Sequence, residues 1–291
     1  MLIMNLDERC YICPRQCGVD RNINRGFCGA NNKIKINKVM LHKWEEPVIS
    51  DGNGSGAIFF SNCSLKCVFC QNYQISHNGI GEEITALQLA NIFKDLEKQG
   101  ANNINLVSPT HYTKQIIQAL NIYKPKIPIV WNTSGYEKVE TIKMLKDYVD
   151  IYLTDLKYVD ENISLKYSGA KDYFKYCSSA IMQMRENQPQ DIIENGIMKK
   201  GMIVRHLVLP SNIKDSKKVL DFINKNLSNN TMISLMSQYI PYYKANNFKE
   251  INRTLKPLEY KIVVNYANKL GFSNGFVQDL TSADSKYTPK F

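Results

Sequence analysis

The sequence of 291 residues predicts an α/β fold in which a parallel β-sheet carries helices outside it. Apolar, β-branched runs alternate with helical patterns six times along the chain. The composition, 44% hydrophobic and 22% charged, is ordinary for a globular protein that buries a sizeable core. The alternation fits either a doubly wound sheet or a partial barrel. In both arrangements the functional groups gather at the carboxyl ends of the strands.

The six predicted strands are short apolar runs of the kind that parallel sheets bury. They are residues 57–62, 103–108, 127–133, 150–157, 202–210 and 231–239. Helical patterns are expected at residues 85–100, 111–120, 137–148, 172–184, 215–227 and 258–271. The first of these helices has the clearest signals: an apolar stripe through Leu89 and Phe93, Thr85 as the N-cap and Gly100 as the stop.

The first 55 residues do not follow this alternation. They contain a group of cysteines and then an expected lead-in strand within KIKINKVMLHKWEEPV, residues 33–48. The glycines of DGNGSG, residues 51–56, suit a tight loop. We therefore expect a cysteine-rich, metal-binding extension at residues 1–55 and a core domain at residues 56–291, which ends in a tail of helix and strand.

Apolar runs in the chain stay well short of the ~20 residues that a membrane helix needs. The N-terminal MLIMNLDERC lacks the basic start and apolar stretch of a secretory signal. We therefore expect a cytoplasmic protein without a membrane partner. The net charge of +10 comes from scattered lysines rather than from a block of like charge, so nucleic acid is not indicated as a partner.

Seven of the eight cysteines lie in the first 70 residues, and cytosolic cysteines in such groups are more often metal ligands or redox groups than disulfides. Cys63, Cys67 and Cys70 have the spacing C-x3-C-x2-C in the loop after the first core strand. A four-iron cluster takes one outside ligand on each iron, usually a thiolate, so three cysteines leave one iron open. A zinc site and three buried thiols are the alternatives. The position of the motif after the first of six strands favours the cluster.

This motif and its place in the chain resemble the radical S-adenosylmethionine (SAM) superfamily, in which an aromatic residue often precedes the last cysteine, as Phe69 does here. The resemblance implies a partial (βα)6 TIM-like barrel and a SAM-binding 4Fe-4S cluster on the three cysteines. It also implies an oxidoreductase in which an electron from the cluster cleaves SAM to a 5′-deoxyadenosyl radical, which abstracts hydrogen from a substrate. A one-electron donor such as flavodoxin or ferredoxin and an anaerobic, oxygen-sensitive enzyme follow from the same resemblance.

The resemblance narrows to the glycyl-radical-enzyme activating enzymes. In particular, the chain resembles pyruvate formate-lyase activating enzyme homologues that carry an extra N-terminal cysteine motif. The segments that carry it, between residues 10 and 241, are CYICPRQCGVDRNINRGFCG, GSGAIFFSNCSLKCVFCQNYQIS, NINLVSPTHY, WNTSGYE, DIYLTDLKY, VRHLVLP and LMSQYIP.

The resemblance also implies roles for residues at the strand ends. The D-T-N-G motif, near the SAM amino group and a bound cation, is matched by residues 132–135, where Asn132 stands in place of the acid and Ser134 in place of the asparagine. Asn132 and Ser134 are therefore expected to bind the cofactor. Asp155 and Lys157 match a D-x-K motif, and Arg205 matches an arginine that suits the SAM carboxylate. We predict these three as catalytic and cofactor-binding residues. Alternation places Asp155 and Lys157 on one strand face, where a simple ion pair is the alternative.

The glycine-rich G-G-E stretch that follows strand two in the family is absent, and SPTHY stands in its place. Ser108 and Thr110 are therefore expected to contact SAM, together with Phe69. His111 is expected either to act on substrate or to cap the next helix. His206 should point to the strand face opposite Arg205 and serve packing or hydrogen bonding.

The N-terminal cysteines Cys10, Cys13, Cys17 and Cys28 have the spacing C-x2-C-x3-C-x10-C, with glycines that suit a metal loop. Four thiolates complete a closed shell, so an auxiliary iron–sulfur cluster or a structural zinc is expected. Four cysteines without metal are disfavoured, because so short a segment lacks the apolar residues to fold alone.

Six further positions carry weaker signals. Cys177 is expected in the core of a helix. Gln238, Tyr239 and Tyr242 either face substrate or pack as aromatic core. His42 and His77 receive no role.

Three functions remain open from the sequence. The first is a radical SAM enzyme that installs a glycyl radical on a partner protein. The second is a radical SAM enzyme that modifies a small molecule, nucleotide or peptide with help from the N-terminal metal site. The third is a non-catalytic iron–sulfur protein, which would bind iron and fail to cleave SAM.

Overall fold

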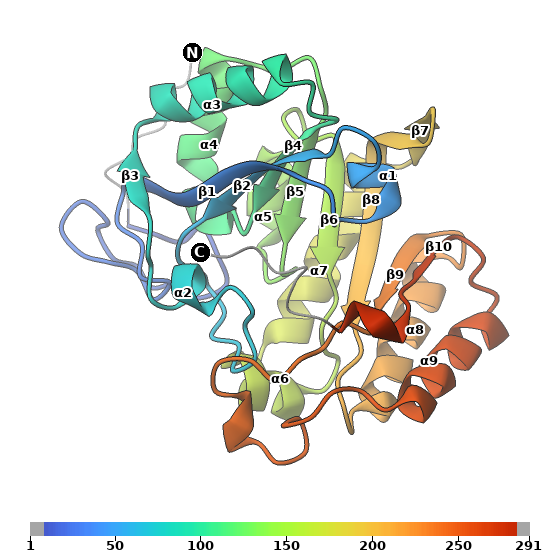
Figure 1. Cartoon of the computed structure of the whole chain (residues 1–291). Coiled ribbons are helices and arrows are strands. Elements are labelled where there is room, and N and C mark those ends of the chain that lie inside the picture. Colours follow the sequence, from blue (N-terminus) through green and yellow to red (C-terminus); the bar gives the residue numbers. More distant parts are fainter. Residues whose placement is uncertain (1–8, 284–291) are drawn as a thin grey trace.

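The computed structural model describes residues 9–283 (Figure 1). One sheet runs through the molecule in the order β10-β9-β8-β6-β5-β4-β2-β1-β3, and β7 pairs with β8 beside it. The strands are β1 (Ile34–His42), β2 (Ser55–Phe60), β3 (Glu82–Ile84), β4 (Ile104–Val107), β5 (Ile129–Thr133), β6 (Ile151–Asp155), β7 (Ile192–Glu194), β8 (Ile197–Leu207), β9 (Met232–Met236) and β10 (Gly275–Val277).

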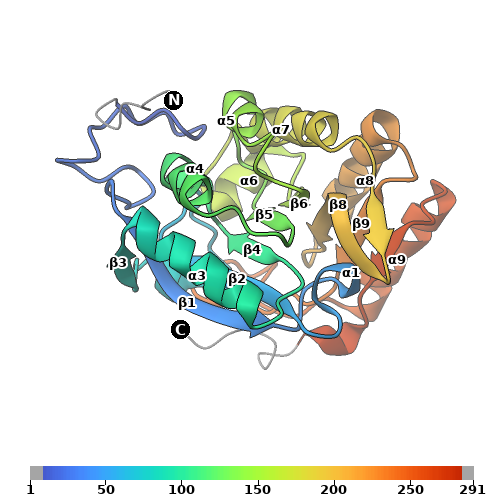
Figure 2. The same cartoon turned by 90° about the horizontal axis from the view of Figure 1, so that it is seen from above.

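All neighbours from β2 to β10 are parallel, whereas β1 and β3 join antiparallel at the other edge. The parallel strands follow one another in chain order without a reversal. A doubly wound sheet requires such a reversal, so of the two arrangements that the sequence allowed, the structure has the partial barrel. Right-handed crossovers in one direction place all connecting helices on the outside, as Figure 2 shows.

The outer helices are α3 (Ala86–Lys98), α4 (Thr113–Ile122), α5 (Val139–Met144), α6 (Glu161–Ser168), α7 (Tyr173–Asn187), α8 (Ile213–Leu227) and α9 (Pro257–Lys269). Two short helices, α1 (Pro47–Ser50) and α2 (Tyr73–Ser76), lie in connections, and 3-10 turns occur at Thr110–Tyr112, Ala245–Asn247 and Leu280–Ser282. No helix in residues 9–283 is long and apolar enough to cross a membrane.

The six predicted strands and six predicted helices all occur in the predicted order, which confirms the α/β fold class. The capping box at the start of α3 is present, because Thr85 accepts from the Gln88 backbone and Gln88 accepts from Thr85. Several boundaries were wrong. The helix expected at 111–120 begins with a 3-10 turn, and the helix expected at 137–148 is limited to α5. The strand expected at 202–210 begins earlier, because its first residues pair with β7.

The barrel interior is filled from below by α1, which the sequence analysis did not predict. Ile49 of α1 is completely buried against Val130, Leu153 and Ile203 on the inner faces of β5, β6 and β8. The residues just before α1 therefore lie inside the barrel, beneath the carboxyl ends of the strands. The expected division of the chain at residues 51–56 lies in the turn between α1 and β2.

The N-terminal extension packs on the barrel from outside. Thr141 donates a hydrogen bond to the Ile12 carbonyl (2.6 Å), and Arg15 donates through Nε to the carbonyl of Ser64 (2.8 Å). Arg21, which is buried, donates to the carbonyl of His111. These contacts hold the extension against α5, the loop that follows β2 and the 3-10 turn that follows β4.

Candidate functional site

A pocket of about 270 Å³ lies at the carboxyl ends of the strands, between the loop after β2 and the barrel interior. It collects most of the residues that the sequence predicted for one site. These are Cys63, Cys67, Phe69, Cys70, Ser108, Asn132, Ser134, Asp155, Lys157 and Arg205.

The three-cysteine loop is held in shape by packing and by backbone hydrogen bonds. Leu65 is almost completely buried, and the ring of Phe69 packs edge-on against Tyr239 with centroids 5.6 Å apart. The backbone N–H groups of Lys66 and Val68 donate to carbonyls of α6 residues, Ser168 (3.0 Å) and Tyr167 (2.8 Å). The protein therefore shapes this loop through its own contacts.

Each thiol of the loop has a polar neighbour. Cys67 Sγ lies 3.0 Å from Ser168 Oγ, and Cys70 Sγ lies 3.1 Å from Ser76 Oγ. The N–H of Leu65 points at Cys63 Sγ (3.4 Å). Burial raises the pKa of Cys63 to about 11 and that of Cys70 to about 12, so these groups are thiols unless a metal deprotonates them.

The loop fits an iron–sulfur cluster better than a single metal ion. Among the described residues, no group of three His, Cys, Asp or Glu side chains converges as one ion requires. The thiolates of a four-iron cluster each bind a different iron, so they surround the cluster instead of meeting at a point. Hydroxyl and N–H groups directed at the sulfurs are the outer contacts that tune such ligands.

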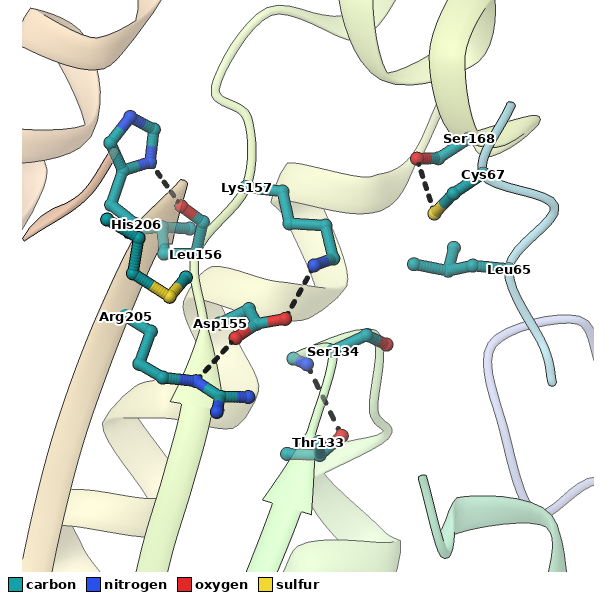
Figure 3. Close-up of polar contacts among 12 residues, drawn as sticks. Leu65, Cys67, Thr133, Ser134, Asp155, Leu156, Lys157, Ser168, Arg205 and His206 are labelled. Atoms are coloured by element: carbon teal, nitrogen blue, oxygen red, sulfur yellow. Dashed lines mark hydrogen bonds and ion pairs between the residues drawn. The ribbon is translucent and has the colours of Figure 1, made fainter. Parts of the chain in front are cut away.

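A buried ion-pair network faces this loop across the pocket (Figure 3). Arg205 donates through Nε to Asp155 Oδ1 (2.8 Å), and Lys157 donates to Asp155 Oδ2 (2.5 Å). Burial alone would raise the pKa of Asp155, but the charges of Arg205 and Lys157 bring it below its ordinary value. Lys157 also interacts electrostatically with Cys67, so its ammonium lies between the network and the cysteine loop.

The sequence analysis missed one member of this network, Glu45, which comes from the segment between β1 and α1. Arg205 donates through Nη1 to Glu45 Oε2 (3.2 Å) and through Nη2 to Asn132 Oδ1 (2.7 Å). Asn132 in turn donates to Glu45 Oε1 (3.1 Å). The sequence feature that could have indicated this residue is a pair of glutamates, Glu45 and Glu46, directly before an apolar segment.

Thr110 is the predicted cofactor contact that the structure does not bring to the pocket. It donates to Glu137 Oε1 (2.6 Å), as Thr133 does (2.6 Å), and Glu137 is completely buried. The 3-10 turn at Thr110–Tyr112 directs this side chain inward. His111 is also buried: its Nε2 lies 2.8 Å from the Ser61 carbonyl, and burial lowers its pKa to about 3. It neither lines the pocket nor caps α4.

The remaining candidates divide between pocket and core. Gln238, Tyr239 and His42 line the pocket, whereas Tyr242 does not. His206 hydrogen-bonds to the Leu156 carbonyl (2.8 Å) on the side away from Arg205, as strand alternation predicts (Figure 3). Cys177 is completely buried in α7, as expected. His77 packs against Tyr243.

The four N-terminal cysteines lie in a tightly folded segment. A side chain at Gly26 would lie within 3.5 Å of the sulfurs of both Cys17 and Cys28. Burial, with a smaller contribution from the neighbouring Cys28 and Cys10, raises the pKa of Cys13 to about 12. The backbone N–H of Cys10 donates to Val19 (2.9 Å), which closes the loop. The fold therefore places the sulfurs of Cys17 and Cys28 near Gly26, whereas no group of three His, Cys, Asp or Glu side chains in residues 9–283 converges as a single metal ion requires.

A partial βα barrel with a three-cysteine loop over a charged strand-end pocket defines the class of SAM-dependent radical enzymes. The model of the radical SAM superfamily matches residues 57–223 of the chain. The chain belongs to the radical SAM superfamily, whose members bind a 4Fe-4S cluster and SAM.

The chain is also similar to other proteins at different distances. A protein of uncharacterised function from Methanocaldococcus jannaschii is 34% identical over 278 residues, which cover 91% of this chain and 76% of the relative. The pyruvate formate-lyase-activating enzyme of Clostridium pasteurianum is 26% identical over 238 residues, or 76% of this chain and 88% of that enzyme. The crystal structure of Streptococcus suis SuiB bound to the precursor peptide SuiA matches with a TM-score of 0.52 at 16% identity. That match covers 76% of this chain and 48% of the SuiB chain, so this chain spans about half of SuiB, and it shows the fold alone.

Proposed function

We propose that the chain is a radical SAM enzyme that reductively cleaves SAM and abstracts hydrogen from a substrate. One observation carries the proposal: the Asp155, Lys157 and Arg205 network faces the three-cysteine loop across a single pocket. In this reaction the 4Fe-4S cluster on Cys63, Cys67 and Cys70, when bound, supplies the electron that cleaves the SAM sulfonium. Cluster loading and activity are expected to be lost in air.

The residues of the pocket would bind and orient SAM. A guanidinium has five N–H donors, and three of those of Arg205 are used within the protein, so two remain for a carboxylate. Lys157 offers a second positive charge on the side of Cys67. Asp155 holds both cations in place, because each of its oxygens accepts from one of them. Phe69, Ser108 and Ser134 complete the wall around this group.

The N-terminal cysteines are proposed to hold a second iron–sulfur cluster or a structural zinc. Support comes from the sulfurs of Cys17 and Cys28, which both lie near Gly26, and from the burial of Cys13 and Cys28. Four thiolates leave no open ligand position, so this site would carry electrons or structure rather than bind SAM.

The substrate proposed first is a glycine residue of a partner protein, in the manner of an activating enzyme. This choice rests on the name of the Clostridium pasteurianum relative and on the segments shared with that family. A small molecule, nucleotide or other peptide is the alternative. A one-electron donor such as flavodoxin or ferredoxin would supply the reducing electron in either case.

The test is formation of 5′-deoxyadenosine from SAM by anaerobically purified, reduced protein. Cys63→Ala should abolish the product, whereas Cys177→Ala, which removes a buried core thiol that belongs to neither cysteine group, should retain it. Iron binding without cleavage by the wild-type protein would favour the non-catalytic alternative. Transfer of deuterium from labelled candidate substrates into 5′-deoxyadenosine would then separate a glycyl-radical partner from a small molecule.

A further inference from the structure

Glu45 occupies a special place at the floor of the pocket. A second pocket of about 330 Å³ adjoins the first, and Glu45 and Gln238 line both. The Glu45 side chain is only 10% exposed, although it lies where the two spaces meet. A ligand group that reached this floor would therefore meet a carboxylate from which water is largely excluded.

The carboxylates around Arg205 outnumber the cations. Glu45, Glu46 and Asp155 all interact with Arg205. Among the described residues, the second cation of this network is Lys157, which pairs with Asp155. Glu46 is 8% exposed, and its Oε2 has no hydrogen-bond partner among the described residues. Glu45, which lines the pocket, has its pKa raised by burial, and a positive charge beside it would offset the cost of keeping it ionised.

Glu45 also has free capacity to accept a hydrogen bond. Its Oε1 accepts from Asn132 (3.1 Å) and Asn105 (3.2 Å), and its Oε2 accepts from Arg205 (3.2 Å). A carboxylate has about four acceptor sites, so about one remains, on Oε2. The protein fixes the orientation of this carboxylate through three donors and leaves the last site for a ligand.

The wall next to Glu45 combines a histidine, whose Nδ1 accepts a hydrogen bond in one of its two neutral tautomers, with apolar surface. His42 lines the same pocket, is 7% exposed, and its Nδ1 has no partner among the described residues. Its ring packs edge-on against Phe59, with centroids 6.1 Å apart. Val107 and Met236 add apolar surface to the same lining. This wall suits a short hydrocarbon chain that ends in a hydrogen-bond donor.

We propose that Glu45 anchors an ammonium-binding subsite at the floor of the pocket, which takes a primary amine on a short apolar chain. The meaning of the subsite for catalysis rests on the proposed function, because it assumes that the pocket is the active site. The amine has two possible sources, the amino group of SAM and an amino group of the substrate. The chemistry that Glu45 recognises is the same in both.

The test uses anaerobically purified, cluster-loaded, full-length protein and saturation-transfer NMR with n-butylammonium and butyrate as probes. n-Butylammonium should give a saturable signal and butyrate none. Glu45→Gln keeps the shape of the side chain and should weaken n-butylammonium binding by about ten-fold or more, the effect of losing one charge-assisted hydrogen bond. The matched control is Glu82→Gln, at an exposed glutamate of β3, which should leave binding unchanged.

Addition of SAM distinguishes the two sources. Competition between SAM and n-butylammonium assigns the subsite to the SAM amino group, and simultaneous binding assigns it to the substrate. The subsite is overturned if the wild-type protein binds butyrate as well as n-butylammonium, a comparison that needs no variant. It is also overturned if a folded Glu45→Gln protein, checked by its thermal unfolding, binds n-butylammonium as the wild type does.

SAM cleavage measured in the same samples reports on the proposed function separately. Cleavage without ammonium binding would overturn the subsite alone. Ammonium binding that depends on Glu45, in protein that cannot cleave SAM, would overturn the proposed function and leave the subsite standing.

Discussion

Gly29, which follows Cys28, lies directly against Asn62, which precedes Cys63. A Cβ atom on Gly29 would be 2.9 Å from Asn62 Oδ1, and Gly29 has a φ of +94° that favours glycine. The two cysteine groups are thus held side by side, although they come from different parts of the fold. Whether each group binds a metal can be decided by removing one group at a time.

The combined variant Cys63→Ala, Cys67→Ala and Cys70→Ala tests the N-terminal site. We expect it to retain about four irons per chain after anaerobic purification, because the four N-terminal thiolates complete the ligand set of a closed cluster. The measurement is iron and zinc content beside the wild type. Zinc alone would make the N-terminal site structural, and loss of all metal would mean that only the loop after β2 binds one.

Lys157 is predicted to contribute directly to SAM binding. Lys157→Met keeps much of the length of the side chain and removes its charge. We expect SAM affinity to fall roughly thirty-fold, equivalent to about 2 kcal/mol for one hydrogen bond to a charged group. Equilibrium dialysis with cluster-loaded protein measures this change, and iron content should stay at the wild-type level.

The control for Lys157→Met is Lys98→Met, at an exposed lysine in the last turn of α3. It should bind SAM as the wild type does. Equal affinity of Lys157→Met and the wild type would contradict the assignment and leave Lys157 as a simple ion-pair partner of Asp155.

The features that sequence could predict are those fixed by local pattern. Parallel buried strands give near-continuous apolar runs, and the two-residue spacing of Asp155 and Lys157 places them together at a strand end. The sequence also contains the signals for α6, since Asp160 caps its start and Gly169 ends it in the left-handed region.

Other features depend on long-range packing and could not be predicted from local pattern. Glu45 enters the site only because α1 fills the barrel interior and carries the preceding residues inward. Thr110 follows a strand end, where cofactor contacts are expected. The 3-10 turn, however, directs its hydroxyl to Glu137, to which it donates a hydrogen bond. The short strand β10 has no alternating pattern and is defined by its pairing with β9.

Gly135 is predicted to be essential for the stability of the strand-end loop after β5. Its φ is +78°, and an added Cβ would lie 2.3 Å from the Asp155 carbonyl oxygen and 2.5 Å from Cys177 Sγ. Gly135→Ala should lower the free energy of unfolding by more than about 3 kcal/mol, because steric overlap adds to backbone strain. Urea unfolding measures the loss.

Gly196→Ala is the matched control, because Gly196 has nearly the same φ, +80°, with open space around it. It should cost only about 1 kcal/mol, the strain of a left-handed backbone. Similar losses in the two variants would show that the contacts around Gly135 relax easily.

His206 should make stability fall as the pH is lowered. Burial lowers its pKa to about 4, and in the fold its two ring nitrogens contact the Leu156 carbonyl (2.8 Å) and Ser216 Oγ (2.9 Å) as a neutral imidazole. In the unfolded chain the same side chain takes a proton below its ordinary pKa of about 6.5. Between these two values only the unfolded state is protonated, so acid favours unfolding. From pH 7 to pH 5 this effect amounts to about 2 kcal/mol.

His206→Gln removes the titrating group, so this part of the pH dependence should disappear even though the variant is less stable at pH 7. The measurement is the difference in unfolding free energy between pH 7 and pH 5 for the variant and the wild type. Loss of metal in acid affects both proteins, so the comparison isolates His206 from it. An equal fall in unfolding free energy in the variant and the wild type would show that His206 is already protonated in the folded protein at pH 5. In that case Ser216 Oγ would have to accept a hydrogen bond from the charged ring.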